Sequence, residues 1–174
     1  MKKVSVDYVE NAKMARKNWP GAVVLDVTLN GGMKKLDPSF PLKKVRIPGI
    51  KGKTALSVSG VWEGLKIFKN KNTIDETFFI SEKKNGKIRN CKSYGKLLGV
   101  KVGESVLDVE RGIEEVFVRT YKEVIKERFK IILKSLKQES EKKTVVLLDY
   151  AEGNEKYPVS HCEILKEMID EDMI

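Results

Sequence analysis

Two short stretches of the sequence hold residues that could do chemistry. The first is residues 57–68, which carry Trp62, Glu63 and Lys66. A partly buried carboxyl group has a raised pKa and can act as a general acid or base, so Glu63 is the first candidate for catalysis. Trp62 could stack on a base or a flavin-like ring, and Lys66 could pair with a phosphate. The structural alternative is a core tryptophan beside a solvated glutamate and a lysine whose stem lies along the surface.

The second stretch begins at the carboxyl end of an apolar run, residues 144–150, whose composition is typical of a strand. Asp149 lies at that end, and Tyr150, Asn154, Ser160 and His161 complete a polar cluster within thirteen residues. Loops at such strand ends are common ligand sites, so Asp149 is the second candidate acid or base, with Asn154 and His161 as ligand contacts. The alternative is that Asp149 and Asn154 make turn hydrogen bonds and that Ser160 caps a helix.

Charge is unevenly distributed along the chain. The 34 basic and 25 acidic side chains give a net charge of +9, but residues 1–101 hold 22 basic and 8 acidic side chains, whereas residues 102–174 hold 12 and 17. A cationic front half indicates an anionic partner, either the phosphates of a nucleotide or a nucleic acid. The alternative is a lysine-rich surface that is only solvated. Further residues predicted to contact such a ligand, at its phosphates or by stacking, are Arg46, Lys87, Arg89 and Tyr94.

Several signatures of known catalytic classes are missing. The chain has one histidine and two cysteines, Cys91 and Cys162, which are too few for a multi-histidine or thiolate metal centre. It has no complete Gly-x-x-x-x-Gly-Lys-Ser/Thr phosphate loop, no Gly-x-Gly-x-x-Gly motif and no Gly-x-Ser-x-Gly elbow. These absences argue against a zinc hydrolase, a P-loop enzyme and a serine esterase. We expect no metal and no cofactor.

The apolar runs also bear on the compartment. None approaches the roughly 18 residues that a membrane span requires, and the first residues lack the apolar core of a signal peptide. We therefore expect a cytoplasmic protein with reduced thiols and no membrane partner, while a homo-oligomer remains open.

The spacing of apolar residues predicts one domain, residues 1–174, of the α+β class: compact and mostly helical with a small sheet. Strands are predicted at 23–28, 77–80 and 144–150, and helices at 7–18, 57–68 and 160–169. Over 105–138 we expect two helices or one bent helix. The remaining expectations are a long loop over 33–56 and the end of a helix at 96–99.

Segments along nearly the whole chain resemble an uncharacterised bacterial and phage family, in the same order. The segments are 19–22, 26–28, 47–49, 57–68, 94–99, 145–150 and 158–161. That family offers no biochemical function to carry over.

A more distant resemblance, over residues 57–68, is to the NADAR superfamily of NAD- and ADP-ribose-associated proteins, which include riboflavin-intermediate N-glycosidases. Those proteins carry a Ser-Glu-His-x-x-Gln-x-x-Lys-type helix early in a compact, mainly helical domain. Glu63 and Lys66 stand where that motif has Gln and Lys, and Trp62 fills its aromatic position. The motif's acidic residue falls on Ser59, whose hydroxyl cannot act as a carboxylate base at neutral pH. The resemblance implies a NADAR-like fold and an ADP-ribose-like ligand.

Three functions remain open. In the first, the chain binds an ADP-ribose-like or related nucleotide and, if it is an enzyme, hydrolyses the N-glycosidic bond with Glu63 or Asp149. In the second, it is a non-catalytic phage-type protein that sequesters a nucleotide immune signal, with Ser59 contacting the ligand. In the third, it is a basic nucleic-acid-binding module, whose affinity should fall steeply with salt.

Overall fold

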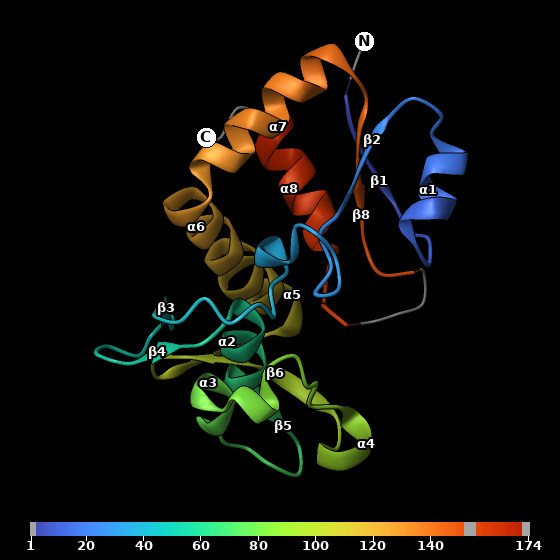
Figure 1. The fold of residues 1–174 in the computed structure, drawn as a ribbon. Helices are drawn as coiled ribbons and strands as arrows, with labels where there is room; N and C mark the ends of the chain where they lie inside the picture. The colour runs from blue at the N-terminus through green and yellow to red at the C-terminus, as the bar shows by residue number, and fades with distance from the viewer. Residues whose placement is uncertain (1–2, 152–155, 172–174) are drawn as a thin grey trace. The chain divides into compact units, whose positions relative to one another are not determined.

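The computed structural model describes residues 3–151 and 156–171, which belong to two compact units. One unit is made of residues up to 37 and from 122 onward, and the other is made of residues 38–121. Figure 1 shows the elements of both. The expected α+β class is confirmed, but the described residues form three small sheets where one was expected.

The first unit is built on a parallel sheet of three strands in the order β1–β8–β2. These strands are β1 (Val4–Asp7), β2 (Val23–Asp26) and β8 (Val145–Leu148). The first residues of β1 and β2 both pair with the first residue of β8. All four residues of β8 are buried, which explains why its sequence is an unbroken apolar run rather than an alternating one.

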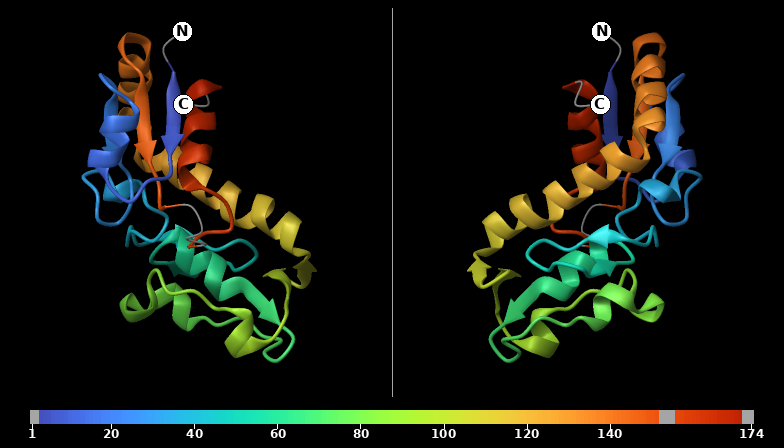
Figure 2. Two further views of the ribbon diagram at one scale, coloured as in Figure 1. Left: turned by 90° about the vertical axis from the view of Figure 1, so that its right-hand side faces the viewer. Right: turned by 90° about the vertical axis from the view of Figure 1, so that its left-hand side faces the viewer.

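Helices cover this sheet because parallel strands need crossover connections. The helix α1 (Ala12–Asn18) contacts β2, α7 (Lys130–Lys142) packs against β8 and α8, and α8 (His161–Asp170) packs along β1. The side-by-side course of α8 and β1 is clear in Figure 2. A short 3₁₀ helix, η1 (Lys34–Leu36), closes the first segment of this unit.

The second unit contains an antiparallel sheet in the order β5–β6–β7. Its central helix, α2 (Val58–Leu65), is buried at every residue and runs directly into β5 (Lys66–Phe68). The other strands of the sheet are β6 (Leu97–Val102) and β7 (Ser105–Leu107). The remaining elements are β3 (Val45–Arg46), β4 (Thr54–Ala55), α3 (Thr77–Ile80), η2 (Glu82–Lys84), α4 (Cys91–Tyr94), α5 (Val109–Gly112) and η3 (Ile113–Val118).

Two glycines let α2 approach its neighbour α3 closely. A β-carbon on Gly60 would lie 2.6 Å from the carbonyl oxygen of Phe78, and one on Gly64 would lie 2.2 Å from the ring of Phe79. The glycine spacing on this helix therefore serves helix packing, since any side chain there would collide with α3.

The helix expected over 7–18 begins later than the sequence indicated. Asp7 belongs to β1, and α1 starts after Asn11, whose side chain accepts hydrogen bonds from the backbone N–H groups of Lys13 and Met14. Pairing with β8 fixes the extended conformation of Asp7, so the cap lies four residues further on.

Three other expectations need correction. Residues 77–80 form a helical turn rather than a strand, because Asp75 accepts hydrogen bonds from the backbone and the hydroxyl of Thr77. Residues 96–99 lead into β6 rather than end a helix. The helix expected over 57–68 stops at Leu65, where the chain becomes extended to pair with β6.

The region 105–138 is confirmed as mainly helical but is divided. After β7, the helical path continues through α5, the π-helical η3 and α6 (Arg119–Arg128), and it breaks at Phe129 before α7. The loop expected over 33–56 contains η1 and the short β3–β4 hairpin. No helix in the described part of the chain has the length and apolar character needed to cross a membrane.

Candidate functional site

A buried ion pair at the end of α2 joins two of the predicted site residues. Glu63 and Lys66 are separated by three positions, and the Lys66 ammonium lies 2.6 Å from the Glu63 Oε1. Their side chains are only 2% and 8% exposed. Burial raises the pKa of Glu63 and lowers the pKa of Lys66, and in each case the partner's charge partly opposes that shift.

Arg89 completes this buried cluster. Its backbone N–H donates to the second carboxylate oxygen of Glu63 at 2.7 Å, and its Nη1 donates to the carbonyl oxygens of Glu63 and Lys66 at 3.0 Å. The guanidinium therefore caps the carboxyl end of α2, where carbonyl groups lack helical partners. We call Glu63, Lys66 and Arg89 the Arg89 cluster.

Arg89 also has donor capacity that the described residues do not use. Arg89 is 2% exposed, and its Nε and Nη2 are buried and make no hydrogen bond of standard geometry within the described part of the chain; the Tyr94 side chain is a weak hydrogen-bond partner of the guanidinium. The guanidinium carbon lies 5.0 Å from the ring centroids of Phe68 and Tyr94. Burial lowers the pKa of Arg89, while Asp75 and Tyr94 oppose that effect.

The other predicted residues of this unit differ in their access to solvent. Trp62 is 3% exposed and packs edge-on against Phe117 with ring centroids 6.0 Å apart, so it lies in the core. Ser59 is buried, and its backbone N–H donates to the carbonyl oxygen of Pro38. Arg46 on β3 and Lys87 after η2 are exposed, whereas Tyr94 covers Arg89. The structure therefore brings Glu63, Lys66, Arg89 and Tyr94 together.

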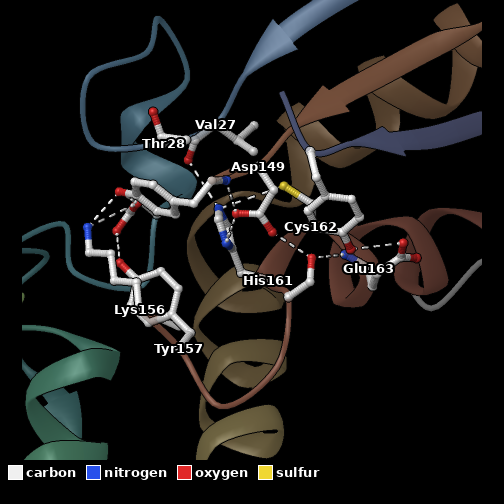
Figure 3. Close-up of polar contacts among 12 residues, drawn as sticks. Val27, Thr28, Asp149, Lys156, Tyr157, His161, Cys162 and Glu163 are labelled. Atoms are coloured by element: carbon white, nitrogen blue, oxygen red, sulfur yellow. Dashed lines mark hydrogen bonds and ion pairs between the residues drawn. The ribbon is translucent and has the colours of Figure 1, made fainter. Parts of the chain in front are cut away.

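In the first unit, Asp149 follows β8 directly and organises a second polar cluster (Figure 3). One of its oxygens accepts from the Ser160 hydroxyl at 2.5 Å. The other accepts from the backbone N–H of Tyr150 at 2.7 Å and lies 3.2 Å from Nδ1 of His161. Ser160 also accepts from the backbone N–H of Glu163 as the N-cap of α8, so its predicted capping role is confirmed.

His161 is fully buried between two hydrogen-bond acceptors. Its Nδ1 faces Asp149, and its Nε2 lies 3.3 Å from the carbonyl oxygen of Val27 and 3.8 Å from the Cys162 sulfur (Figure 3). Asp149, His161 and Cys162 each offer one atom that could bind a metal ion, and these three atoms lie within 4.8 Å of one another. Burial and the Asp149 charge raise the pKa of the Cys162 thiol well above its usual range, so it is protonated and is not the thiolate that metals prefer.

A third group combines Tyr150, which belongs to the predicted polar cluster, with Asp37, Lys156 and Tyr157, which the sequence analysis missed. Asp37 is 1% exposed and accepts hydrogen bonds from the hydroxyl groups of Tyr150, at 2.7 Å, and of Tyr157. The Lys156 ammonium donates to the Tyr150 hydroxyl at 2.6 Å and lies over both tyrosine rings. No local signal could have found this group, because Asp37 and Tyr150 are 113 positions apart.

The two candidate acids, Glu63 and Asp149, lie in different units. Each therefore belongs to a cluster of its own, and neither unit by itself contains both. Asn154, which was predicted to contact the ligand, lies outside the described residues.

Comparison with known proteins places the chain in a family. It belongs to a family of unknown function (DUF6939), whose profile matches residues 8–165. No curated protein and no solved structure matches the chain. The predicted membership of an uncharacterised family is thus confirmed, whereas these comparisons do not link the chain to NADAR proteins.

Proposed function

We propose that the chain binds a phosphate-bearing, nucleotide-type ligand at the Arg89 cluster, with an ADP-ribose-like molecule as the leading candidate. One observation carries the proposal: Nε and Nη2 of Arg89 are buried and make no hydrogen bond of standard geometry among the described residues, where Tyr94 is only a weak partner of the guanidinium. A buried donor without a partner costs about 1–3 kcal/mol, and more when the group is charged. Such a cost is understandable where a ligand supplies the missing acceptors.

The chemistry of the guanidinium indicates what kind of ligand this is. Nε and one terminal nitrogen of arginine form a planar fork that matches two oxygens of a phosphate or carboxylate. The Tyr94 ring lies beside the guanidinium, with its centroid 5.0 Å from the guanidinium carbon. A ligand bound at the fork would therefore lie near this ring, which could stack on a base.

Within this proposal the protein holds the ligand without cleaving it. Both carboxylate oxygens of Glu63 already accept hydrogen bonds, one from Lys66 and one from Arg89. Both oxygens of Asp149 are occupied as well. The NADAR resemblance adds that its acidic position is Ser59 here. An N-glycosidase needs a carboxylate near the anomeric carbon, and these observations favour sequestration.

The test is calorimetric titration with ADP-ribose, AMP and inorganic phosphate, followed by mass spectrometry of the recovered ligand. Arg89→Lys keeps the charge but removes the fork, so affinity should fall about 10- to 100-fold, the value of one charge-assisted hydrogen bond. Arg111→Gln is the matched control, since Arg111 is exposed and, within the described part of the chain, its guanidinium pairs with Glu115 four residues further along.

The outcomes separate the alternatives. Intact ligand after binding supports sequestration, and ligand cleaved at its N-glycosidic bond supports the hydrolase. Absence of binding to all three probes, or equal affinity of the Arg89→Lys variant and the wild type, would overturn the proposal. Melting curves of both variants show whether the fold is retained.

The nucleic-acid alternative retains one favourable observation. Residues 38–101 hold 15 basic and 4 acidic side chains, and three of those acids are already paired with lysines. If the exposed basic side chains of this segment bind duplex DNA, the logarithm of affinity should fall with the logarithm of salt concentration by about 0.9 for each phosphate contact. Binding that does not depend on salt excludes this function.

A further inference from the structure

The first unit holds a cavity of about 230 Å³ between the turn that follows α1 and the residues that lead into β8. Residues 18–22 form one wall, and Lys143 and Thr144 form the other. The backbone N–H of Val23 donates to the carbonyl oxygen of Thr144 at 2.9 Å, so the two walls are held together. We call this cavity the Trp19 pocket.

The turn at residues 19–22 shapes the first wall. The backbone N–H of Ala22 donates to the carbonyl oxygen of Trp19 at 3.1 Å, which closes the turn. Pro20 and Gly21 lie at its centre, and Gly21 has a φ of 79°, in the left-handed region that favours glycine. The residue types of this segment therefore fix the shape of the turn, and the pocket has one preformed wall.

The Trp19 ring is held in place from outside the pocket. Its Nε1 donates to Oδ2 of Asp7 at 3.1 Å, and the Asn18 amide donates to the same oxygen at 3.3 Å. Trp19 is half-buried and lines the pocket, whereas Asp7 is not a lining residue. A ring that is already fixed by a hydrogen bond loses little conformational entropy when a ligand packs against it.

The charge of the pocket is positive. Lys143 is exposed and is the only charged residue among those that line the pocket. Further cations flank it, since Arg16 and Lys17 lie in the last turn of α1 and Lys142 lies in the last turn of α7. An anionic ligand is therefore favoured over a neutral or cationic one.

We propose that the Trp19 pocket binds a small aromatic carboxylate, with its ring against Trp19 and its carboxylate near Lys143. A cavity of about 150 Å³ holds benzene, so 230 Å³ suits one ring with a short charged substituent. This volume is too small for ADP-ribose. Because the pocket and the Arg89 cluster belong to different units, this proposal and the proposed function can fail separately.

The first experiment is an NMR titration of the ¹⁵N-labelled protein with benzoate, read at the indole N–H signals of Trp19 and Trp62. Trp62 is 3% exposed and belongs to the other unit, so only the Trp19 signal should move. The dissociation constant should be about 1 mM or lower, as expected for so small a ligand. Trp19→Phe assigns the signals by the loss of one. Benzoate at about 10 mM that moves neither signal, or moves both alike, overturns the proposal.

Two further probes separate the ring from the charge. Benzamide keeps the aromatic ring but carries no charge, and cyclohexanecarboxylate keeps the charge but has no aromatic ring. Each should bind about 3-fold or more weakly than benzoate, because it lacks either the ion pair or the aromatic contact. Equal affinity for all three probes contradicts the proposed ligand class.

A pair of variants tests the position of the carboxylate. Lys143→Gln should weaken benzoate binding about 3- to 5-fold, the effect of one exposed ion pair, and should leave benzamide binding unchanged. Lys134→Gln is the matched control, since it makes the same charge change at an exposed position of α7 that does not line the pocket. An equal loss in both variants reflects net charge alone and refutes the contact with Lys143. Both variants alter exposed side chains, so the test needs no substitution in the core.

Discussion

The buried pair of Glu63 and Lys66 allows a quantitative test of the electrostatics at the end of α2. Replacing Lys66 by methionine keeps the length of the side chain but leaves the Glu63 carboxylate without its cation, which lies 2.6 Å away in the wild type. Removal of one partner from a buried ion pair costs about 3–5 kcal/mol. For a chain of this length each kcal/mol shifts Tm by about 2–4 °C, so Lys66→Met should melt roughly 6–20 °C lower.

The pKa shift of Glu63 also predicts how the stability difference between Lys66→Met and the wild type changes with pH. Burial already raises the pKa of Glu63, and Lys66 is the main group that opposes the shift, so the pKa rises further in Lys66→Met. A carboxyl group whose pKa is higher in the folded than in the unfolded state stabilises the fold at low pH, and this contribution is lost as the pH rises through the folded value. The stability gap between variant and wild type should therefore be wider at pH 8 than at pH 5.

Urea denaturation at both pH values measures this gap. Glu63→Gln/Lys66→Met should recover much of the loss, since the double variant lacks both charges of the pair and glutamine still offers an oxygen to the Arg89 backbone. Lys53→Met is the surface control, because Lys53 and Glu76 form an equally short pair at 55% and 51% exposure, which contributes at most about 1 kcal/mol. A gap for Lys66→Met that is the same at pH 5 and pH 8, or narrower at pH 8, refutes the reasoning.

Three further predictions concern local features. Ser160→Ala removes the N-cap of α8 and should lower the free energy of unfolding by about 1 kcal/mol, whereas Ser160→Thr should retain most of it because its hydroxyl can still cap the helix and donate to Asp149; urea titrations would show this. Gly64→Ala places a methyl group 2.2 Å from a buried ring and should cost about 1–3 kcal/mol, while Gly32→Ala, in open space, should change stability by less than about 0.5 kcal/mol in the same assay. Maleimide should label Cys91 and spare the buried Cys162, and a double label on the native protein contradicts this.

Local sequence patterns were sufficient for the elements whose burial is uniform. The apolar run that became β8 and the periodic stretch that became α2 were found because a buried strand and a buried helix have characteristic sequence patterns. The run that became β2 was predicted as a buried strand from its β-branched residues, but its four residues are only half-buried. The run at 77–80 is equally apolar, but its conformation is decided by Asp75, a polar residue two positions upstream that bonds to Thr77. Periodicity does not record such a contact.

The same distinction applies to the candidate sites. Glu63 and Lys66 were recognisable together because positions i and i+3 share a helix face, and their contact is local. Asp149 and Ser160 were recognisable as a strand end and a helix start. By contrast, Asp37 meets Tyr150 and Tyr157 across 113 and 120 positions, so only the fold brings these residues together.

In the structure, cationic side chains have more unused hydrogen-bonding capacity than the candidate carboxylates. Residue type alone favoured Glu63 and Asp149, yet both carboxylates have their oxygens engaged by neighbouring donors. Arg89, by contrast, has two buried donor nitrogens, Nε and Nη2, without a hydrogen bond of standard geometry among the described residues. A saturated acceptor can position other groups but has little capacity left for a ligand, whereas an unused donor can bind one. Ligands that offer hydrogen-bond acceptors therefore suit this chain better than ligands that need a free carboxylate.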